Sequence, residues 1–268
     1  MNSIESFILG VFQGFAEFLP ISSSGHLVIL QRLFNLTSDN IVFEVSVHFG
    51  TLLSVIAIYY LDLWKMIVSF FSGLFSKNFR SNFRHDEYFR LAVFVVIATI
   101  PAGIVGVVFN DFIESIFHSV RLVGIMLMIT GVLLFLTRFV KIQERKLGGW
   151  NSVMIGVCQA IAILPGISRS GATISAGLFC GISRMEAARF SFLLSVPAVF
   201  GAAILEGKDA LAFGVPTLDF KILSIGLISS FIVGYLSLKL LLKIVQSGKF
   251  SWFAPYCLLV GFLTLLFL

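Results

Sequence analysis

Two short polar segments interrupt an otherwise apolar chain, and they contain the residue types that could do chemistry. Residues 20–26 read Pro-Ile-Ser-Ser-Ser-Gly-His, and residues 165–173 read Pro-Gly-Ile-Ser-Arg-Ser-Gly-Ala-Thr. Hydroxyl groups and unpaired backbone N–H groups at the start of a helix favour a bound anion, because the free donors and the helix dipole act together. Each segment therefore predicts an anion site.

Charged and polar side chains in and next to these segments indicate which anion they bind. Gln13 and Glu17 stand four residues apart, so they share one face of a helix and point into the same cavity. Arg169 carries a fork of donors that suits phosphate oxygens, and burying it in a membrane without an anionic partner is costly. These residue types point to a phosphate ligand.

The elements that position these residues are membrane helices. Of the 268 residues, 58% are hydrophobic and 12% are charged, and the mean hydropathy is +1.01. A helix needs about 20 apolar residues to cross a bilayer. We therefore expect an all-α polytopic membrane protein with six full spans. The expected spans are residues 41–61, 90–109, 119–138, 187–206, 219–242 and 252–268.

The two polar segments lie inside two further apolar stretches, residues 4–34 and 152–181. A polar break exposes backbone groups that hydrocarbon cannot satisfy, so it must lie inside the protein or at a water-filled cavity. Two half-helices joined at mid-membrane satisfy this requirement. We expect a re-entrant helical hairpin in each stretch, with Pro20 ending the first half-helix, residues 22–25 forming the turn and His26 beginning the second.

The two hairpins are copies of each other. At an ungapped offset of 146, eight residues in each hairpin are identical. The matching residues of the first copy are Gly10, Val11, Gln13, Ala16, Ile21, Ser22, Ser24 and Gly25. Three spans follow each hairpin, which leaves the second half upside down, as in inverted-repeat transporters. The chain is therefore expected to be one membrane domain, residues 1–268, with repeats at 1–140 and 150–268.

Basic residues support this placement, because they gather on one expected side of the membrane. That side receives Lys65, Lys77, Arg80, Arg84, Arg90, Arg138, Lys141, Arg145, Lys146, Arg184, Arg189, Lys239, Lys243 and Lys249. The other side has Arg32, Arg121, Lys208 and Lys221. The positive-inside rule makes the rich side cytoplasmic, with both termini and the mouth of the first hairpin outside. The rule also accounts for the net charge of +5 without a nucleic-acid partner.

Structural roles compete with the chemical ones. Arg169 and Glu17 can form a structural ion pair, and His26 can be a satisfied core histidine. Glu44, His48, Glu186 and Arg189 occur at similar places after each hairpin, and we expect them to hold the hairpins in position.

The segment from Gln13 to His26, with its Phe-Leu-Pro-Ile-Ser-Ser-Ser-Gly-His end, and residues 165–173 together resemble the undecaprenyl-diphosphate phosphatases of the bacitracin-resistance type. The resemblance covers the whole chain. It implies removal of the terminal phosphate from undecaprenyl diphosphate, an isoprenoid lipid carrier of bacterial cell-wall synthesis, with help from Mg²⁺ or Ca²⁺. It also implies a multi-pass protein of the bacterial plasma (inner) membrane, with its site on the extracytoplasmic side, and it leaves a homodimer open.

This resemblance and the residue chemistry together assign the site. The catalytic candidates are Glu17, Ser23, His26 and Arg169, with Glu17 as general base or metal ligand. The nucleophile is Ser23, His26 or an activated water, and the sequence does not choose among them. The expected substrate-binding residues are Gln13, Ser22, Ser24, Gly25, Ser168, Ser170, Gly171 and Thr173. The family's first motif begins with Glu or Gln, so Gln13 argues against a second carboxylate there.

Three rival interpretations remain open. Inverted repeats with facing broken helices also build secondary transporters, so the same site could carry a lipid phosphate across the membrane. A second class of lipid phosphatases has Pro-Ser-Gly-His and a later His after Ser-Arg. Ser24-Gly25-His26 imitates its first part, but Ser175 stands where the later His is required, which counts against that class. The paired hairpins count against a purely structural membrane protein.

Overall fold

The computed structural model describes the chain apart from residues 35–40, 77–78, 110–111, 114–115, 117–118 and 214–218, and apart from the side chains of residues 31, 33, 34, 41 and 205–213. Its elements in the described part are helices, with one isolated β-bridge between Arg145 and Ile182 and no strand. The all-α fold is therefore confirmed. Of the basic residues assigned to the two sides, Lys77 and the Lys208 side chain lie outside the described part.

Eleven α-helices and two short 3₁₀ helices are described. The α-helices are α1 (Ser3–Phe18), α2 (Ser23–Phe34), α3 (Ile41–Leu74), α4 (Phe79–His85), α5 (Glu87–Val108), α7 (Val120–Leu136), α8 (Gly149–Ile161), α9 (Arg169–Phe179), α10 (Arg184–Phe213), α11 (Phe220–Gln246) and α12 (Ala254–Phe267). The 3₁₀ helices are η1 (Thr137–Phe139) and η2 (Phe250–Phe253).

Six of these helical segments are long and apolar enough to cross a membrane, as the sequence predicts. They are Val42–Leu74, Glu87–Val108, Val120–Phe139, Arg184–Ile204, Phe220–Gln246 and Phe250–Phe267. The first extends to Leu74, well beyond the expected end at residue 61. Its backbone is kinked at Tyr59 (φ −108°, ψ 21°), and Asp62 lies within the helix because it binds Arg189 of α10 there.

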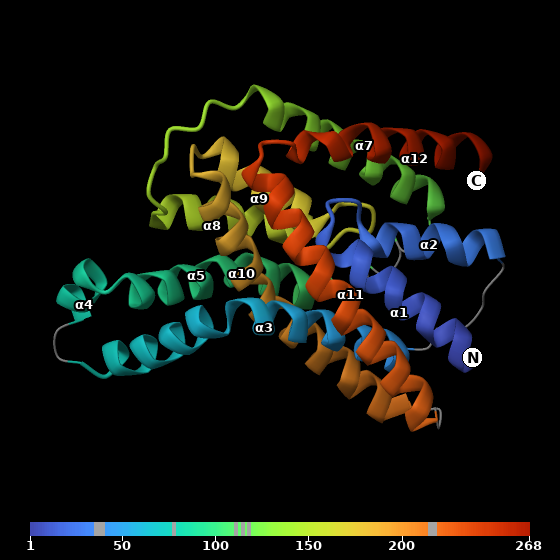
Figure 1. Cartoon of the computed structure of the whole chain (residues 1–268), viewed down its shortest axis with the longest axis horizontal. Helices are drawn as coiled ribbons and strands as arrows, with labels where there is room; N and C mark the ends of the chain where they lie inside the picture. The colour runs from blue at the N-terminus through green and yellow to red at the C-terminus, as the bar shows by residue number, and fades with distance from the viewer. Residues whose placement is uncertain (35–40, 77–78, 110–111, 114–115, 117–118, 214–218) are drawn as a thin grey trace.

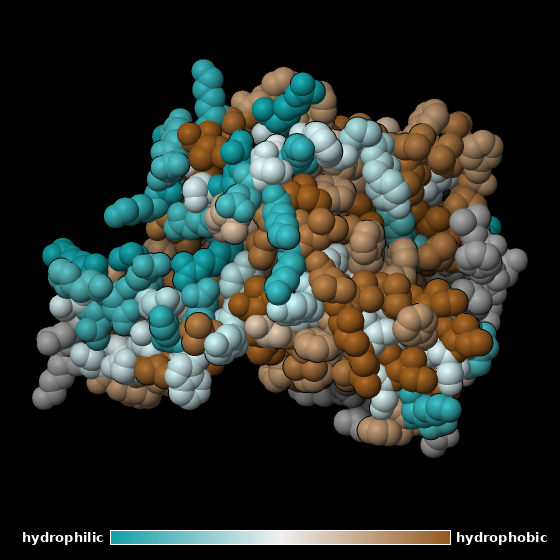
Figure 2. All heavy atoms as spheres, viewed as in Figure 1, coloured by the Kyte–Doolittle hydropathy of each residue, from teal (hydrophilic) through white to brown (hydrophobic). Residues whose placement is uncertain are grey.

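The helices lie roughly along one direction, and this arrangement separates the two ends of the molecule (Figure 1). Both termini and the far end of α2 lie on the right, whereas α4 and the start of α5 lie on the left. α1 packs against α11 and α3, α12 packs along α7, and α8 packs between α5 and α9. Figure 2 shows hydrophilic side chains gathered at the left end and hydrophobic ones over most of the remaining face.

The core lies between α1, α9 and α10. Phe18 at the end of α1 meets Phe192 of α10 edge to face, with ring centroids 5.9 Å apart. Tyr59 stacks on the same Phe192 ring from the kink in α3. Ile174 on α9 is fully buried. This packing places the end of α1 and the start of α9 beside each other in the middle of the molecule, where both polar segments lie.

Candidate functional site

The first polar segment forms a sharp turn between α1 and α2. Ser22 has a left-handed backbone (φ +65°), which reverses the chain within a few residues. Its Oγ accepts a hydrogen bond from the N–H of Gly25 at 3.2 Å and so caps α2. Our expectation that His26 begins this helix is wrong, because the cap on Ser22 lets the helix begin at Ser23. Ser23, Ser24 and Gly25 therefore form the first turn of α2.

The second polar segment is built in the same way. Ser168 caps α9 by accepting a hydrogen bond from the N–H of Gly171 at 3.1 Å. The helix begins at Arg169, so Arg169, Ser170 and Gly171 form its first turn. The serine pairs also correspond, since the Oγ atoms of Ser22 and Ser24 lie 3.4 Å apart and those of Ser168 and Ser170 lie 3.2 Å apart.

The two turns touch each other. The Oγ of Ser22 accepts a second hydrogen bond, at 3.2 Å, from the N–H of Gly166. Gly166 has a positive φ of +97°, which glycine adopts without strain. A Cβ on Gly25 would lie 2.8 Å from the Cα of Gly166, so the two backbones meet at a distance that only glycine allows. The predicted substrate-binding residues of both segments thus lie in one region.

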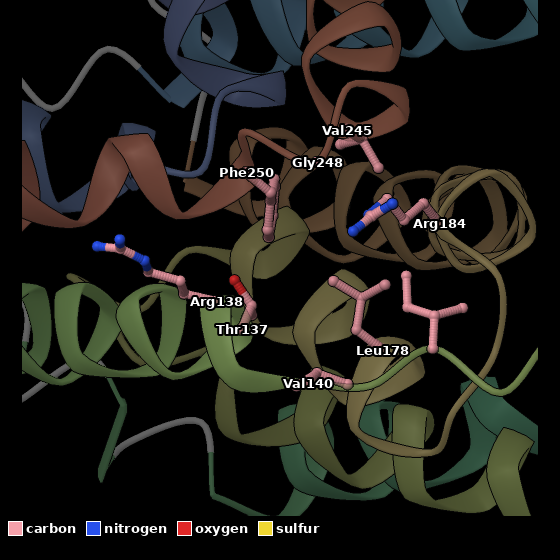
Figure 3. Close-up of a pocket in the computed structure, with 9 residues that line it drawn as sticks. Thr137, Arg138, Val140, Leu178, Arg184, Val245, Gly248 and Phe250 are labelled. Atoms are coloured by element: carbon pink, nitrogen blue, oxygen red, sulfur yellow. The ribbon is translucent and has the colours of Figure 1, made fainter.

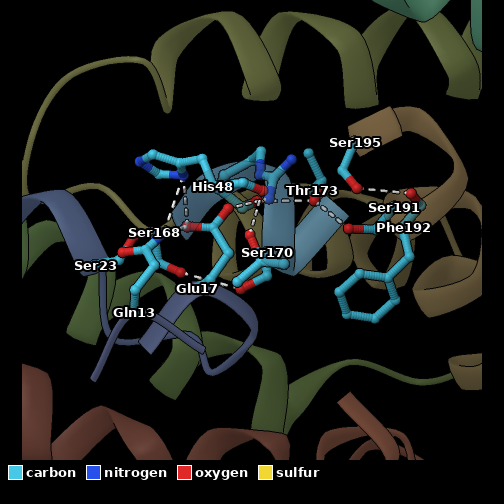
Figure 4. A network of polar contacts seen from close by, with 12 residues as sticks. Gln13, Glu17, Ser23, His48, Ser168, Ser170, Thr173, Ser191, Phe192 and Ser195 are labelled. Atoms are coloured by element: carbon cyan, nitrogen blue, oxygen red, sulfur yellow. Dashed lines mark hydrogen bonds and ion pairs between the residues drawn. The ribbon is translucent and has the colours of Figure 1, made fainter. Parts of the chain in front are cut away.

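Glu17 is the centre of the polar cluster where these turns meet (Figure 4). Its Oε1 accepts a hydrogen bond from Nη2 of Arg169, and its Oε2 accepts hydrogen bonds from Ser23 Oγ at 2.9 Å and Gln13 Nε2 at 3.0 Å. The Glu17 side chain is 9% exposed. Three predicted site residues therefore meet around the buried carboxylate of a fourth, and Arg169 reaches Glu17 from the other polar segment.

His48 of α3 joins this cluster, although only a supporting role is expected for it from the sequence. Its Nδ1 lies 2.9 Å from Gln13 Nε2 and 3.7 Å from Glu17 Oε2. The Gln13 amide nitrogen can only donate, so Nδ1 accepts and the ring proton of neutral His48 is on Nε2. Helical spacing relates Gln13 to Glu17 but carries no information about a residue on another helix.

Arg169 has one donor left over inside the cluster. Its Nη1 is buried and has no hydrogen-bond partner among the described residues, although its Nη2 binds Glu17. An unsatisfied buried N–H of a charged group is costly, because the group has lost its water and gained nothing in exchange. An oxygen of an anionic ligand would satisfy this donor. The arrangement fits an anion that enters beside the Glu17–Arg169 pair.

His26 lies outside the Glu17 cluster. Its Nδ1 is 2.9 Å from the carbonyl oxygen of Ser22, and its Nε2 is 2.7 Å from the hydroxyl of Tyr256 on α12. The two rings stack with centroids 5.6 Å apart and an interplanar angle of 5°. Sequence reasoning missed Tyr256, because it lies in a distant span with no motif around it.

Thr173 is also turned away from Glu17. Its Oγ1 donates to the carbonyl oxygen of Arg169 at 2.8 Å and lies 2.6 Å from the Oγ of Ser191 on α10. Figure 4 shows Thr173 and Ser191 on the far side of the cluster from Gln13. This hydroxyl fixes the first turn of α9 against α10, so Thr173 supports Arg169 in this arrangement and does not face Glu17.

The donors around Glu17 fit a divalent cation only in part. No group of three His, Cys, Asp or Glu side chains in the described part of the chain is placed to hold a metal ion. Both Glu17 oxygens already accept hydrogen bonds from protein donors. Mg²⁺ in proteins is often held by one or two carboxylates together with substrate phosphates. The cluster can therefore hold such an ion only with phosphate oxygens that complete its coordination.

A second set of charges joins α10, α3 and α5. Arg189 of α10 binds Asp62 of α3 through Nη2 at 2.7 Å and Nε at 3.2 Å, and it binds Glu87 of α5 at 3.4 Å. These bonds tie three helices together, but none of the three belongs to an expected hairpin, so the role of Arg189 in holding the hairpins stays a prediction. Glu186 lines a cavity of about 280 Å³ beside it, and Glu44 lies on α3 near the other end.

A smaller cavity, of about 60 Å³, lies where η1, α9, α11 and η2 approach one another (Figure 3). Arg184 extends toward it, whereas the guanidinium of Arg138 points away from the other lining residues, and Phe250 lies on one side. Neither this cavity nor the larger one includes a residue of the Glu17 cluster. The polar chemistry predicted from the sequence therefore lies apart from both.

Comparison with known proteins agrees with the site geometry. The family model described as "Bacitracin resistance protein BacA" matches residues 6–263. A protein of Desulforapulum autotrophicum named undecaprenyl-diphosphatase is 44% identical over 273 residues, which cover 99% of this chain and 98% of that protein. Proteins of the same name from Halothermothrix orenii and Methanosphaera stadtmanae are 41% and 37% identical, each over 99% of this chain and 98% of the relative.

Proposed function

This chain belongs to the bacitracin resistance protein BacA family, and we propose that it is an integral membrane phosphatase that hydrolyses undecaprenyl diphosphate to undecaprenyl phosphate and inorganic phosphate. Relatives that share its full length are named for this activity. The reaction recycles a lipid carrier for peptidoglycan synthesis, and it would give resistance to bacitracin. The observation that carries the proposal is the buried Glu17–Arg169 pair, in which Arg169 Nη1 meets no acceptor within the described part of the chain.

We propose that α1–α2 and α8–α9 are re-entrant hairpins in an inverted repeat. In support, each pair has a serine cap of the same geometry, and the two turns meet in the middle of the molecule. Both outer ends of α1 and α2 lie on the right in Figure 1, whereas α8 starts on the left. The basic left end is then cytoplasmic by the positive-inside rule, and the first hairpin opens to the extracytoplasmic side. The membrane is then the bacterial plasma (inner) membrane.

We propose Ser23 as the nucleophile and Glu17 as its general base. The Ser23 hydroxyl already donates to Glu17 Oε2 at 2.9 Å, which is the geometry that proton transfer needs. Ser23 Oγ would attack the terminal phosphorus while its proton passes to Glu17. The bond from phosphorus to the bridging oxygen breaks, and undecaprenyl phosphate leaves. Water then hydrolyses the phosphoserine, releases inorganic phosphate and restores the serine hydroxyl.

Arg169 and the two helix starts hold the diphosphate in this mechanism. Nη1 of Arg169 is available for a phosphate oxygen, and the guanidinium can stabilise the negative charge that develops as the bond to the bridging oxygen breaks. A divalent cation, Mg²⁺ or Ca²⁺, would be held by Glu17 together with phosphate oxygens and would neutralise part of the diphosphate charge. The Gln13 amide donates to Oε2 of Glu17 while Arg169 binds Oε1, so the two residues together orient the carboxylate.

His26 is less suited to nucleophilic attack than Ser23. Its Nδ1 must carry a proton, because the Ser22 carbonyl oxygen that it contacts can only accept. Its Nε2 is covered by the Tyr256 hydroxyl at 2.7 Å. Trapping of a phosphoenzyme from labelled substrate tests the choice, and we expect the label on Ser23 and no trapped label in Ser23→Ala. Label on His26 would overturn this assignment.

The deciding experiment is phosphate release by purified protein supplied with undecaprenyl diphosphate. Wild type should release phosphate, and Arg169→Lys should lose at least about 100-fold in kcat/KM because lysine lacks the planar fork. Arg32→Lys, the same change at an exposed arginine of α2, should be unaffected. Both variants should unfold at the wild-type temperature within a few degrees.

The transporter interpretation makes the opposite prediction for this assay. A protein that only moves the lipid would release no phosphate, and it would instead move labelled lipid between the leaflets of vesicles. Folded wild-type protein without phosphate release in the presence of Mg²⁺ or Ca²⁺ would therefore refute the phosphatase. Near-normal turnover by Arg169→Lys would refute the site assignment while leaving the activity in place.

A further inference from the structure

Tyr256 on α12 is bonded to a predicted catalytic residue, and no motif contains it. Its hydroxyl lies 2.7 Å from Nε2 of His26, and its ring stacks on the imidazole. Phe12 of α1 lies on His26 as well, with ring centroids 6.2 Å apart. His26 is 8% exposed and so is enclosed by two aromatic rings from two different helices. Its orientation is fixed from outside its own hairpin.

The hydrogen bonds of His26 determine where its proton lies. The Ser22 carbonyl oxygen only accepts, so the 2.9 Å contact requires a proton on Nδ1. In the described part of the chain the His26 ring interacts with the backbone of Ser22 and Ile21, the Tyr256 hydroxyl and the Phe12 ring, none of which is charged. A buried imidazole without an anionic partner is neutral, because burial disfavours the charged form. Nε2 therefore holds a lone pair, and the Tyr256 O–H donates to it.

We propose that Tyr256 is a positioning residue for His26, which it holds as a proton acceptor at Nε2. This inference rests on the proposed phosphatase activity. With the Nδ1 proton committed to Ser22, the ring can take up a proton only at Nε2, once the Tyr256 hydroxyl rotates away. His26 then serves as a base toward the water that hydrolyses the phosphoserine, and Tyr256 keeps the Nε2 lone pair aligned until that moment.

Ser22 connects this pair to the meeting point of the two turns. Its carbonyl oxygen accepts a hydrogen bond from the Nδ1–H of His26, and its hydroxyl oxygen accepts hydrogen bonds from the N–H groups of Gly25 and Gly166. The left-handed backbone at Ser22 lets one residue present both groups. α12 contributes a second support nearby, since Cys257 Sγ donates to the Pro20 carbonyl at 3.3 Å. The last helix of the chain thus braces the first hairpin at two adjacent positions.

The test is Tyr256→Phe, which removes the hydroxyl and keeps the stacked ring. Histidine ring ¹⁵N spectra of the protein in lipid nanodiscs report on Nε2, and the chain has four histidines, so His26→Gln assigns the resonance. We expect the Nε2 resonance of His26 to move toward that of an unbonded lone pair in Tyr256→Phe, while Nδ1 stays protonated. The kcat for phosphate release should fall about tenfold, the effect of one lost hydrogen bond, with KM within about twofold.

Tyr60→Phe is the matched control, because Tyr60 lies on α3 and is 59% exposed. It should change neither the His26 resonance nor kcat. An unmoved Nε2 resonance in Tyr256→Phe would overturn the inference whatever the activity, and so would a moved resonance with unchanged kcat or a loss in KM alone. Wild-type protein that releases no phosphate would instead overturn the proposed function, and the Nε2 resonance would still decide whether Tyr256 holds His26.

Discussion

The Ser22 side chain should contribute more to the free energy of unfolding than that of Ser168, although the two serines occupy matching positions. Ser22 Oγ accepts hydrogen bonds from the N–H groups of Gly25 and Gly166, both at 3.2 Å. Ser168 Oγ accepts one backbone N–H, that of Gly171, at 3.1 Å. Both serines are buried, at 3% and 2% exposure, so water does not replace a lost acceptor. The difference between them is one buried N–H.

The magnitudes follow from these bonds. Loss of a helix cap costs about 1 kcal/mol, and each further buried N–H left without a partner costs about 1 to 3 kcal/mol. Ser168→Ala should therefore lower the free energy of unfolding by about 1 kcal/mol, and Ser22→Ala by about 2 to 4 kcal/mol. Ser22→Gly should lose less than Ser22→Ala, by about 1 kcal/mol, because glycine relieves the left-handed backbone at this position.

Reversible unfolding of the three variants in mixed detergent micelles, followed by helical circular dichroism, measures these differences. Equal losses for Ser22→Ala and Ser168→Ala would refute the reasoning, because the contact between the two turns would then contribute nothing to stability. A Ser22→Gly variant less stable than Ser22→Ala would refute the role assigned to the left-handed backbone. Phosphate release should fall with Ser22→Ala even at temperatures where the variant is fully folded.

Three further outcomes can be checked on the same purified protein. Gly25→Ala should lower the free energy of unfolding by about 1 to 3 kcal/mol, because the new Cβ would lie 2.8 Å from the Gly166 Cα. Gly103→Ala should be neutral or slightly stabilising in thermal unfolding, because its Cβ would meet no atom of the described residues within 4 Å. Arg189→Ala should lower the free energy of unfolding by about 1 to 3 kcal/mol because Asp62 loses this partner. The kcat should stay unchanged because Arg189 bonds Asp62 and Glu87 rather than the Glu17 cluster. Chelation should abolish phosphate release, and added Mg²⁺ or Ca²⁺ should restore it; an unaffected rate would remove the cation from the mechanism.

The apolar pattern predicted the spans because length and hydropathy alone decide whether a helix can cross a bilayer. It failed at the end of α3, where Asp62 suggests a boundary. An ion pair with Arg189 keeps that carboxylate inside a helix that continues to Leu74. Arg189 follows Asp62 by 127 residues, so the sequence around residue 62 does not reveal this partner.

The predicted site likewise contains residues that local patterns reveal and residues that only the fold brings together. Gln13, Glu17 and Ser23 were found from spacing and motif, and the structure gathers them with Arg169 around one carboxylate. The start of α2 was misplaced because a serine in the left-handed region lets the chain turn faster than a run of polar residues suggests. His48 and Tyr256 were not recognised as site residues, because helical periodicity relates residues within one helix and not across helices.

The matching segments divide the chemistry between them. Each keeps the serine cap, yet the position of Glu17 is Ile163 in the second copy, and the position of Ser23 is Arg169. Gln159, the counterpart of Gln13, is buried with neither amide atom bonded in the described part of the chain. The first turn therefore has a carboxylate without its own guanidinium, and the second has a guanidinium without a base. Because the site exists only where the turns meet, the Ser22 bond to Gly166 should matter for activity as much as a residue that touches the substrate.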